Sequence, residues 1–180
     1  MPIEPDSKDW TWVLERPCPE CGFDASTFPA AEVAALIRSN AAAWARLLSG
    51  RPGDLRRRPG DERWSPLEYA CHVRDVCRLY DERLDLMLRH DDPLYANWDQ
   101  DATAAEDDYN GQDPLTVATE LKGAALGLAE AFDQVEGAQW QRTGRRSDGA
   151  TFTVDTFSRY LVHDPVHHLF DVTGERAPSP

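Results

Sequence analysis

The sequence SRYLVHDPVHHLFDV, residues 158–172, decides how this chain is interpreted. On a helix, His163 and His167 would lie four residues apart, so they would share one face at a distance of about one turn. Two imidazoles at that spacing can bind one divalent metal if a third ligand comes from elsewhere in the chain. His72, in the stretch WSPLEYACHVRDV, is the candidate for that third ligand.

The composition limits the class of protein. A length of 180 residues suits one domain with a sizeable core. Contents of 41% hydrophobic and 28% charged residues are ordinary for a globular protein. A net charge of -13 opposes binding to nucleic-acid phosphates and to anionic membrane surfaces. We therefore expect small molecules or proteins as partners, and neither nucleic acid nor membrane.

The sequence also carries no visible targeting segment. No stretch approaches the ~18 consecutive apolar residues of a transmembrane helix. The N-terminus, MPIEPDSKDWTW, has neither the cationic nor the apolar region of a secretory signal. These features predict a cytoplasmic location, where the four cysteines would be mostly reduced.

The apolar residues recur at helical spacing in four segments of about 20 residues. The segments cover about residues 29–49, 65–90, 113–136 and 154–172. The second has the clearest start, because Ser65, Pro66 and Glu68 form a capping box with proline in the first turn. The fourth segment should stop at Gly174.

These segments predict an all-α fold, a four-helix bundle over residues 29–174. An irregular N-terminal arm (residues 1–28) should precede it and a flexible tail (residues 175–180) should follow it. Residues 91–113 form a long acidic connection between the second and third helices. Such a loop is usually functional or crosses an end of the bundle, and its Trp98 and Tyr109 either line a site or pack on the surface. Residues 139–153 are typical of a short irregular segment or a hairpin.

The arm contains the motif CPEC at Cys18–Cys21. A Cys-x-x-Cys pair is half of a structural zinc site or a redox pair. Cys71 and Cys77 are six residues apart on a predicted helix, so they point in different directions and cannot complete the site together. A histidine or a carboxylate could complete it. The alternative is a knuckle-like turn with reduced thiols.

Three neutral imidazoles from facing helices are a known way to build a metal site in a bundle core. We predict His72, His163 and His167 as the ligands, which leaves a coordination position open for water or substrate, as in catalytic sites. Zinc or nickel, and also iron or manganese, accept such ligands. A single histidine beside a buried stripe is more often a hydrogen-bonded core residue, so the alternative is that His72 never meets the other two.

Other polar residues have expected roles around this site. Glu68, Asp75 and Asp164 are candidate carboxylates that would orient the ligands. We expect His168 to point elsewhere on its helix and His90 to lie at a helix end, both without a ligand role. Pro165 removes a helical hydrogen bond between the two candidate ligands, so it should kink the helix.

The stretches WSPLEYACHVRDV, YNGQDPLTVATEL and YLVHDPVHHLFDV together resemble the DinB-like (YfiT-like) superfamily of metalloenzymes over about residues 30–173. The resemblance implies a four-helix bundle that holds a divalent metal through His72, His163 and His167. Members with assigned activity include S-transferases and isomerases that use mycothiol, bacillithiol or glutathione. The alanine- and arginine-rich composition suggests a high-GC genome, so mycothiol is the preferred thiol.

The resemblance implies a metal-dependent S-transferase in which the metal favours the thiolate of a small-molecule thiol, which then attacks an electrophile. Arg142, Arg145 or Arg146 would meet an anionic group, or belong to a solvated hairpin. The alternative is a metal-binding or stress-response protein without catalysis, one that could form a homodimer through a bundle face. Related domains of iron-dependent sulfoxide synthases carry His-x-x-x-His-x-Glu, but Leu169 stands at the last position here, so that chemistry is not supported.

Overall fold

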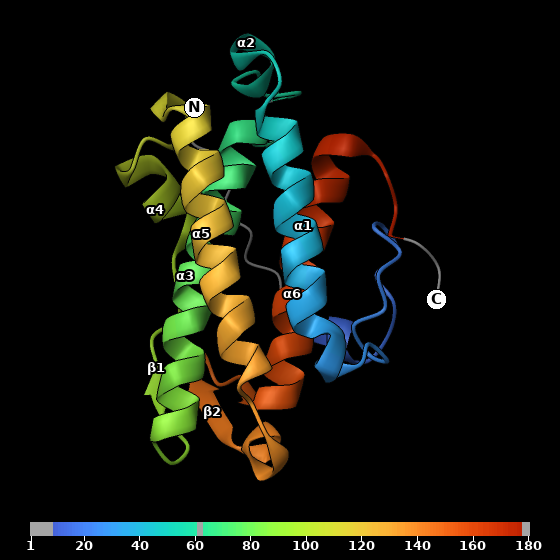
Figure 1. The fold of residues 1–180 in the computed structure, drawn as a ribbon, viewed down its shortest axis with the longest axis vertical. Coiled ribbons are helices and arrows are strands. Elements are labelled where there is room, and N and C mark those ends of the chain that lie inside the picture. The colour runs from blue at the N-terminus through green and yellow to red at the C-terminus, as the bar shows by residue number, and fades with distance from the viewer. Residues whose placement is uncertain (1–8, 61–62, 178–180) are drawn as a thin grey trace.

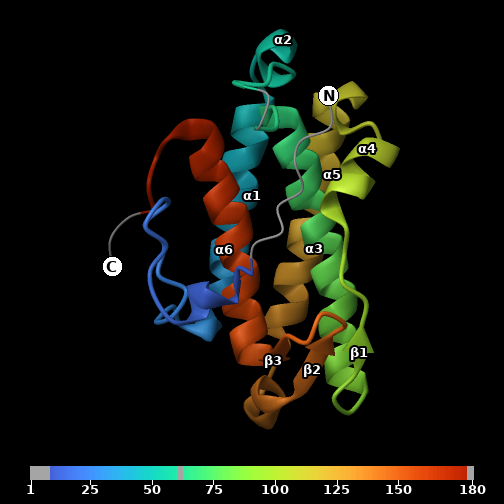
Figure 2. The same ribbon diagram turned by 180° about the vertical axis from the view of Figure 1, so that it is seen from behind.

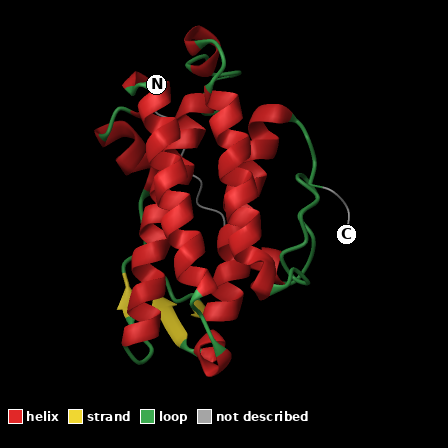
Figure 3. Cartoon of the chain, viewed as in Figure 1, coloured by secondary structure: helices red, strands yellow, loops and turns green. Residues whose placement is uncertain are grey.

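The computed structural model describes residues 9–60 and 63–177, so the first eight residues of the predicted arm and the last three of the predicted tail lie outside the described residues. Long helices dominate the fold (Figures 1 and 3). They are α1 (Val33–Leu48), α3 (Pro66–Arg89), α5 (Pro114–Asp133) and α6 (Val154–Thr173). The predicted all-α four-helix bundle is confirmed, and a small sheet at one end is a minor addition.

The ends of these helices follow local sequence signals. At the start of α3, Ser65 Oγ accepts a hydrogen bond from the backbone amide of Glu68, and the Ser65 amide donates to the Glu68 carboxylate. This is the capping box expected from the sequence. Helix α6 ends at Gly174, whose φ of 72° is left-handed and suits a residue without a Cβ. Pro165 lies buried within α6, and its carbonyl accepts a hydrogen bond from the Asn40 side chain at 3.0 Å.

The order of the helices in space differs from their order in the sequence. Helices α5 and α6 each pack against both α1 and α3, which therefore lie diagonally across the bundle. Helices α3 and α5 run in the same direction, because the connection between them returns along the length of the bundle (Figure 1). This return explains the length of the connection. The sequence had suggested a functional loop or a crossing of one end of the bundle.

The connection has structure of its own. It contains the strand β1 (Leu94–Tyr95), the helix α4 (Gln100–Glu106) and the 3-10 turn η3 (Tyr109–Gly111). Strand β1 pairs in parallel with β2 (Thr143–Arg146), which pairs antiparallel with β3 (Thr151–Thr153) as the expected hairpin. The hairpin is thereby joined to a strand that has no pattern of its own in the sequence. The shorter elements that remain are η1 (Thr11–Leu14), η2 (Ala30–Glu32), α2 (Pro52–Leu55) and η4 (Gly137–Gln141).

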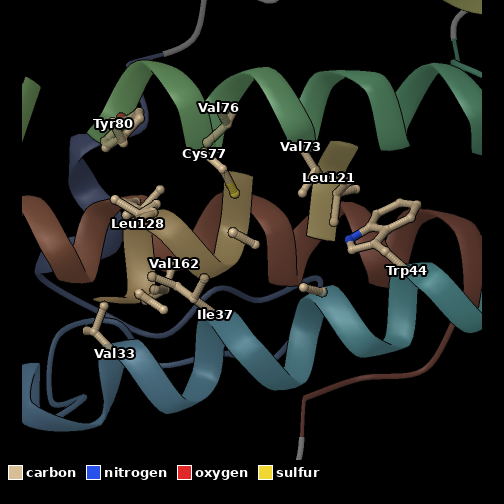
Figure 4. Close-up of a cluster of buried hydrophobic side chains, with 14 of the residues drawn as sticks. Val33, Ile37, Trp44, Val73, Val76, Cys77, Tyr80, Leu121, Leu128 and Val162 are labelled. Carbon is tan, nitrogen blue, oxygen red and sulfur yellow. The ribbon is translucent and has the colours of Figure 1, made fainter. Parts of the chain in front are cut away.

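The core lies between the four long helices. Figure 4 shows buried side chains from all four, among them Trp44, Val73, Leu121 and Val162. On α1 the buried stripe runs from Val33 through Ile37 and Trp44 to Leu48. No helix among the described residues has both the length and the apolar character to cross a membrane.

The N-terminal arm packs along α6 on the outside of the bundle (Figure 2). The backbone amide of Ala177 donates to the carbonyl of Cys21 at 2.8 Å, and the Arg176 side chain donates to the carbonyl of Pro19 at 2.8 Å. Residues from both ends of the chain therefore meet beside this helix. This docking brings the CPEC motif to the helix that carries the histidines.

Candidate metal centre

Helix α6 carries two pairs of candidate donors at one spacing. His163 and His167 are four residues apart, and Asp164 and His168 are four residues apart, shifted by one position. Successive helical residues are rotated by about 100°, since a turn takes 3.6 residues, so the two pairs face different neighbours. They form two groups of possible metal ligands, one with the arm and one with α3.

The first group joins His72 of α3 to Asp164 and His168 of α6, with one donor atom of each lying within 4.8 Å of the others. Nε2 of His72 is 3.3 Å from Oδ2 of Asp164. The ring of His72 is fully buried and stacks on Trp98 at a centroid distance of 5.3 Å. Its Nδ1 and the Oδ1 of Asp164 have no hydrogen-bond partner among the described residues.

A further carboxylate orients this group. Nδ1 of His168 lies 3.0 Å from Oδ2 of Asp171, and its Nε2 lies 3.8 Å from Oδ1 of Asp164. A carboxylate that holds one nitrogen of an imidazole fixes the ring and leaves the other nitrogen for a metal. Burial acts to raise the pKa of Asp164, but the charges of His72 and His168 outweigh it and hold this pKa below its usual range. Asp164 is therefore ionised, which is the form that binds a metal.

The second group joins Cys18 and Cys21 of the arm to His163 and His167. All four residues are buried, and one donor atom of each lies within 4.8 Å of the other three. Sγ of Cys18 is 3.6 Å from Nδ1 of His167. Nε2 of His163 has no hydrogen-bond partner among the described residues. The arm thus supplies two sulfur atoms to the histidine pair that the sequence singles out.

The protonation states of this group follow from its burial. Burial lowers the pKa of His163 to about 4, and the neighbouring His167 lowers it further in the same direction. Burial also lowers the pKa of His167. For Cys21, burial raises the pKa of the thiol to about 12. Both imidazoles are therefore neutral at neutral pH and can act as donors, while Cys21 stays a thiol unless a cation stabilises its thiolate.

The structure divides the three histidines predicted from the sequence between these groups. His163 and His167 lie together as their spacing predicts, but beside the two cysteines, whereas His72 contacts the neighbouring face of α6. The set of His72, His163 and His167 as ligands of one ion stays a prediction, since it matches neither group. The reason for the division is the one-residue shift between the two pairs on α6.

Other expectations need correction. His168, expected to point away, has its ring centroid 4.9 Å from that of His72. Glu68 pairs with Arg58 and closes the capping box, so it stabilises the start of α3. Asp75 pairs with Arg74 and accepts a hydrogen bond from the Tyr109 hydroxyl at 2.7 Å. Of the three carboxylates expected around the ligands, only Asp164 touches one of the predicted histidines.

Two residues were missed by the sequence reasoning as members of a site. For His168 the available signal was its spacing of four from Asp164, the same spacing that singles out His163 and His167. For Asp171 it was the spacing of three from His168, which places both side chains on one face of the helix.

A cleft of about 890 Å³ is lined by members of both groups, namely Asp164 and His168 of the first and His163 and His167 of the second. Its walls include the arm at Asp9–Thr11, the connection at Asn97–Asp101, and the hairpin at Arg146 and Asp148. Asp164 exposes 34% of its side chain. Trp98 lines the cleft and stacks on His72. Of the two roles expected for Trp98, lining a site or packing on the surface, it therefore has the first. Tyr109 instead is buried in contact with α3.

The model of a protein family described as the DinB superfamily matches residues 35–170, which is most of the chain. The chain belongs to the DinB superfamily. No curated protein matches the chain significantly.

A solved structure with the same fold is YfiT from Bacillus subtilis, described as "a probable metal-dependent hydrolase with an unusual four-helix bundle topology". This DinB-superfamily chain is 17% identical to YfiT, with a TM-score of 0.64, over 96% of this chain and 90% of YfiT. The diagonal placement of α1 and α3 is thus part of a fold that both proteins share.

The donor groups fit a divalent metal. In the first group, two imidazoles and an ionised carboxylate converge from two helices, and each of His72 and Asp164 has a buried polar atom without a hydrogen-bond partner among the described residues. Buried polar atoms without partners are costly, so such atoms in a native structure call for a ligand, ion or water. Two histidines and one carboxylate also form a known set of catalytic metal ligands.

Proposed function

We propose that this protein is a metal-dependent thiol S-transferase whose metal is held by His72, Asp164 and His168. The observation that carries this proposal is the convergence of these three donors, of which Asp164 and His168 line the cleft. Three protein donors leave a position for a small molecule, as in catalytic rather than structural sites. When bound, a divalent cation supplies a charge that stabilises the thiolate form of a coordinated thiol at neutral pH.

The chain's own residues prepare this site. Asp171 accepts the Nδ1 proton of His168 and so holds the ring with Nε2 directed toward Asp164. Trp98 and Trp64 pack on His72 at centroid distances of 5.3 Å each, which keeps water from that imidazole. These contacts fix the donors before any ligand arrives, and fixed donors lower the cost of assembling a site.

The cleft suits a polar thiol larger than cysteine. Its lining combines the aromatic faces of Trp10 and Trp98 with carboxylates and with Arg83 and Arg146. Aromatic faces pack on rings, while carboxylates accept hydrogen bonds from hydroxyl and amide groups. This mixture supports a thiol of the mycothiol type, which carries sugar rings, as the co-substrate, with a small electrophile as its acceptor. Of the three arginines considered for an anionic group, Arg146 lines the cleft and is already paired with Asp148.

Metal-dependent hydrolysis is the second candidate. It is supported by the description of YfiT and by the open side of the same donor set, which water can reach as well as a thiol. The two candidates differ in the nucleophile only. A metal-binding role without catalysis is the third outcome that an assay has to distinguish.

The test uses the full chain, stripped of metal and then loaded separately with zinc, nickel, iron(II) or manganese(II). A chromogenic electrophile is supplied with mycothiol, bacillithiol or glutathione, and a chromogenic ester is supplied without any thiol. We expect metal-dependent conjugation with mycothiol that is lost in His168→Ala and Asp164→Ala. His90→Ala is the matched control, because His90 ends α3 and belongs to neither donor group.

Each result has a distinct meaning. Ester hydrolysis without conjugation would replace the transferase by a hydrolase. Bound metal without either reaction would support the non-catalytic role. If His168→Ala keeps both activity and metal while His163→Ala loses both, the ligands would be His72, His163 and His167 instead.

A further inference from the structure

The CPEC motif forms a turn that the transferase proposal does not use. The backbone amide of Gly22 donates to the carbonyl of Cys18 at 2.9 Å, and the amide of Cys18 donates to the carbonyl of Phe23 at 2.9 Å. Gly22 has a φ of 80°, a conformation that side chains with a Cβ rarely adopt. This tight turn places Cys18 and Cys21 so that their sulfur atoms approach the same pair of histidines.

The two histidines complete a set of four donors. His163 and His167 are exposed by only 4% and 7%, and Cys18 and Cys21 by 1% and 0%. The contact of Cys18 with His167 is 3.6 Å long, while Nε2 of His163 is buried without a partner among the described residues. A buried imidazole nitrogen without a hydrogen-bond partner beside two thiols is an independent sign that this group binds a ligand.

We propose that Cys18, Cys21, His163 and His167 bind one zinc ion in a structural site separate from the group of His72, Asp164 and His168. Two sulfur and two nitrogen donors are a known closed set for structural zinc. With zinc bonds of about 2.3 Å to sulfur and about 2.0 Å to nitrogen, the donor atoms of a tetrahedron lie about 3.3–3.8 Å apart. The separations of up to 4.8 Å in this group therefore need only small side-chain shifts. Binding transfers the two thiol protons to solvent.

The identity of the ion follows from the donors. Sulfur with imidazole nitrogen in a four-donor set favours zinc over magnesium, calcium or manganese, which prefer oxygen. The other group contains an oxygen donor and three protein ligands, so it is the more open of the two. One helix would thus hold a closed site on one face and an open site on the next.

The zinc would join the arm to α6. Trp10 of the arm packs on His163 and His167 at ring centroid distances of 5.6 and 5.4 Å. Asp9, Trp10 and Thr11 also form part of the wall of the cleft. Loss of the ion would therefore loosen this wall as well as the arm.

The test measures metal content and the spectrum of the cobalt-substituted chain. In the unaltered protein, cobalt(II) should give a thiolate-to-cobalt charge-transfer band and the intense visible bands of tetrahedral coordination. The charge-transfer band should vanish in the double variant C18S/C21S and persist in His168→Ala. The double variant C71S/C77S is the matched control, since both cysteines are buried in α3 and belong to neither group. Zinc content should fall by one ion per chain in C18S/C21S and stay unchanged in C71S/C77S.

A second measurement covers the case in which C18S/C21S does not fold. The zinc-loaded protein is exposed to iodoacetamide with and without a chelator, and each cysteine is followed by peptide mass spectrometry. Chelation should speed alkylation of Cys18 and Cys21 by about tenfold or more, because a sulfur atom bound to the metal is protected from iodoacetamide until the metal is removed. Cys71 and Cys77 should not change. Absence of the charge-transfer band in the unaltered chain, or equal alkylation with and without chelator, would overturn the proposal.

Discussion

The substitution Asp171→Asn tests whether a carboxylate outside the ligand set positions His168. Oδ2 of Asp171 lies 3.0 Å from Nδ1 of His168, and this interaction lowers the pKa of Asp171 against the opposing effect of burial. Asparagine has almost the same shape but lacks the charge, so it holds the imidazole less firmly and makes it a weaker donor. Loss of such a partner usually weakens metal binding about 10- to 100-fold. That corresponds to about 1.4–2.7 kcal/mol of binding free energy.

The assay is a zinc titration of the metal-free chain in competition with a fluorescent chelator. Asp155→Asn is the matched control, because Asp155 is a carboxylate on the same helix that pairs with Arg159 instead. Asp171 also lies 3.8 Å from His167, beyond hydrogen-bond distance. The cobalt spectrum should therefore keep its thiolate band in Asp171→Asn. Affinity within twofold of the unaltered chain, or an equal loss at the cysteine site, would refute the reasoning.

Three further predictions concern stability, measured by urea unfolding. Trp44→Ala should lower the free energy of unfolding by about 3–5 kcal/mol, because Trp44 is fully buried between helices; a loss under about 1 kcal/mol would show that the site collapses without cost. Gly144→Ala should destabilise by about 1–3 kcal/mol, since a Cβ there would lie 2.7 Å from Cγ of Met87; unchanged stability would mean that Met87 moves freely. Burial acts to raise the pKa of Glu68, but the pairing with Arg58 outweighs it and keeps this pKa below its usual value. The stabilisation of the fold by ionised Glu68 is therefore complete above the pKa of the unfolded chain and is lost as the pH falls through the pKa of the folded chain. Glu68→Gln should therefore be destabilising near neutral pH and less so in acid, and a difference independent of pH would contradict this.

The helices were predictable because their signals are local. Ser65 and Glu68 cap α3, and Gly174 ends α6, in each case through contacts within four residues along the chain. The pairing of β1 with β2 was not predictable in this way. Leu94 and Arg145 are partners far apart in the sequence, and two residues are too few to show alternation.

The candidate site was predictable only in part. The spacing of His163 and His167 determines that they share a face, but a helical repeat does not say which neighbour that face meets. The same spacing relates Asp164 to His168, and a shift by one residue changes the neighbour from the arm to α3. Local pattern alone could not choose between the two pairs.

The all-α class, the capping box at Ser65 and the helix end at Gly174 could therefore be predicted from local patterns, as could most of the metal donors, although His168 was assigned no ligand role. How those donors combine depends on the packing of the helices and the arm. It packs α3 against one face of α6, which brings His72 to Asp164 and His168, and it docks the arm on the next face. These contacts join segments that are far apart in the sequence, so the residues of the CPEC turn alone cannot indicate which helix the turn packs against.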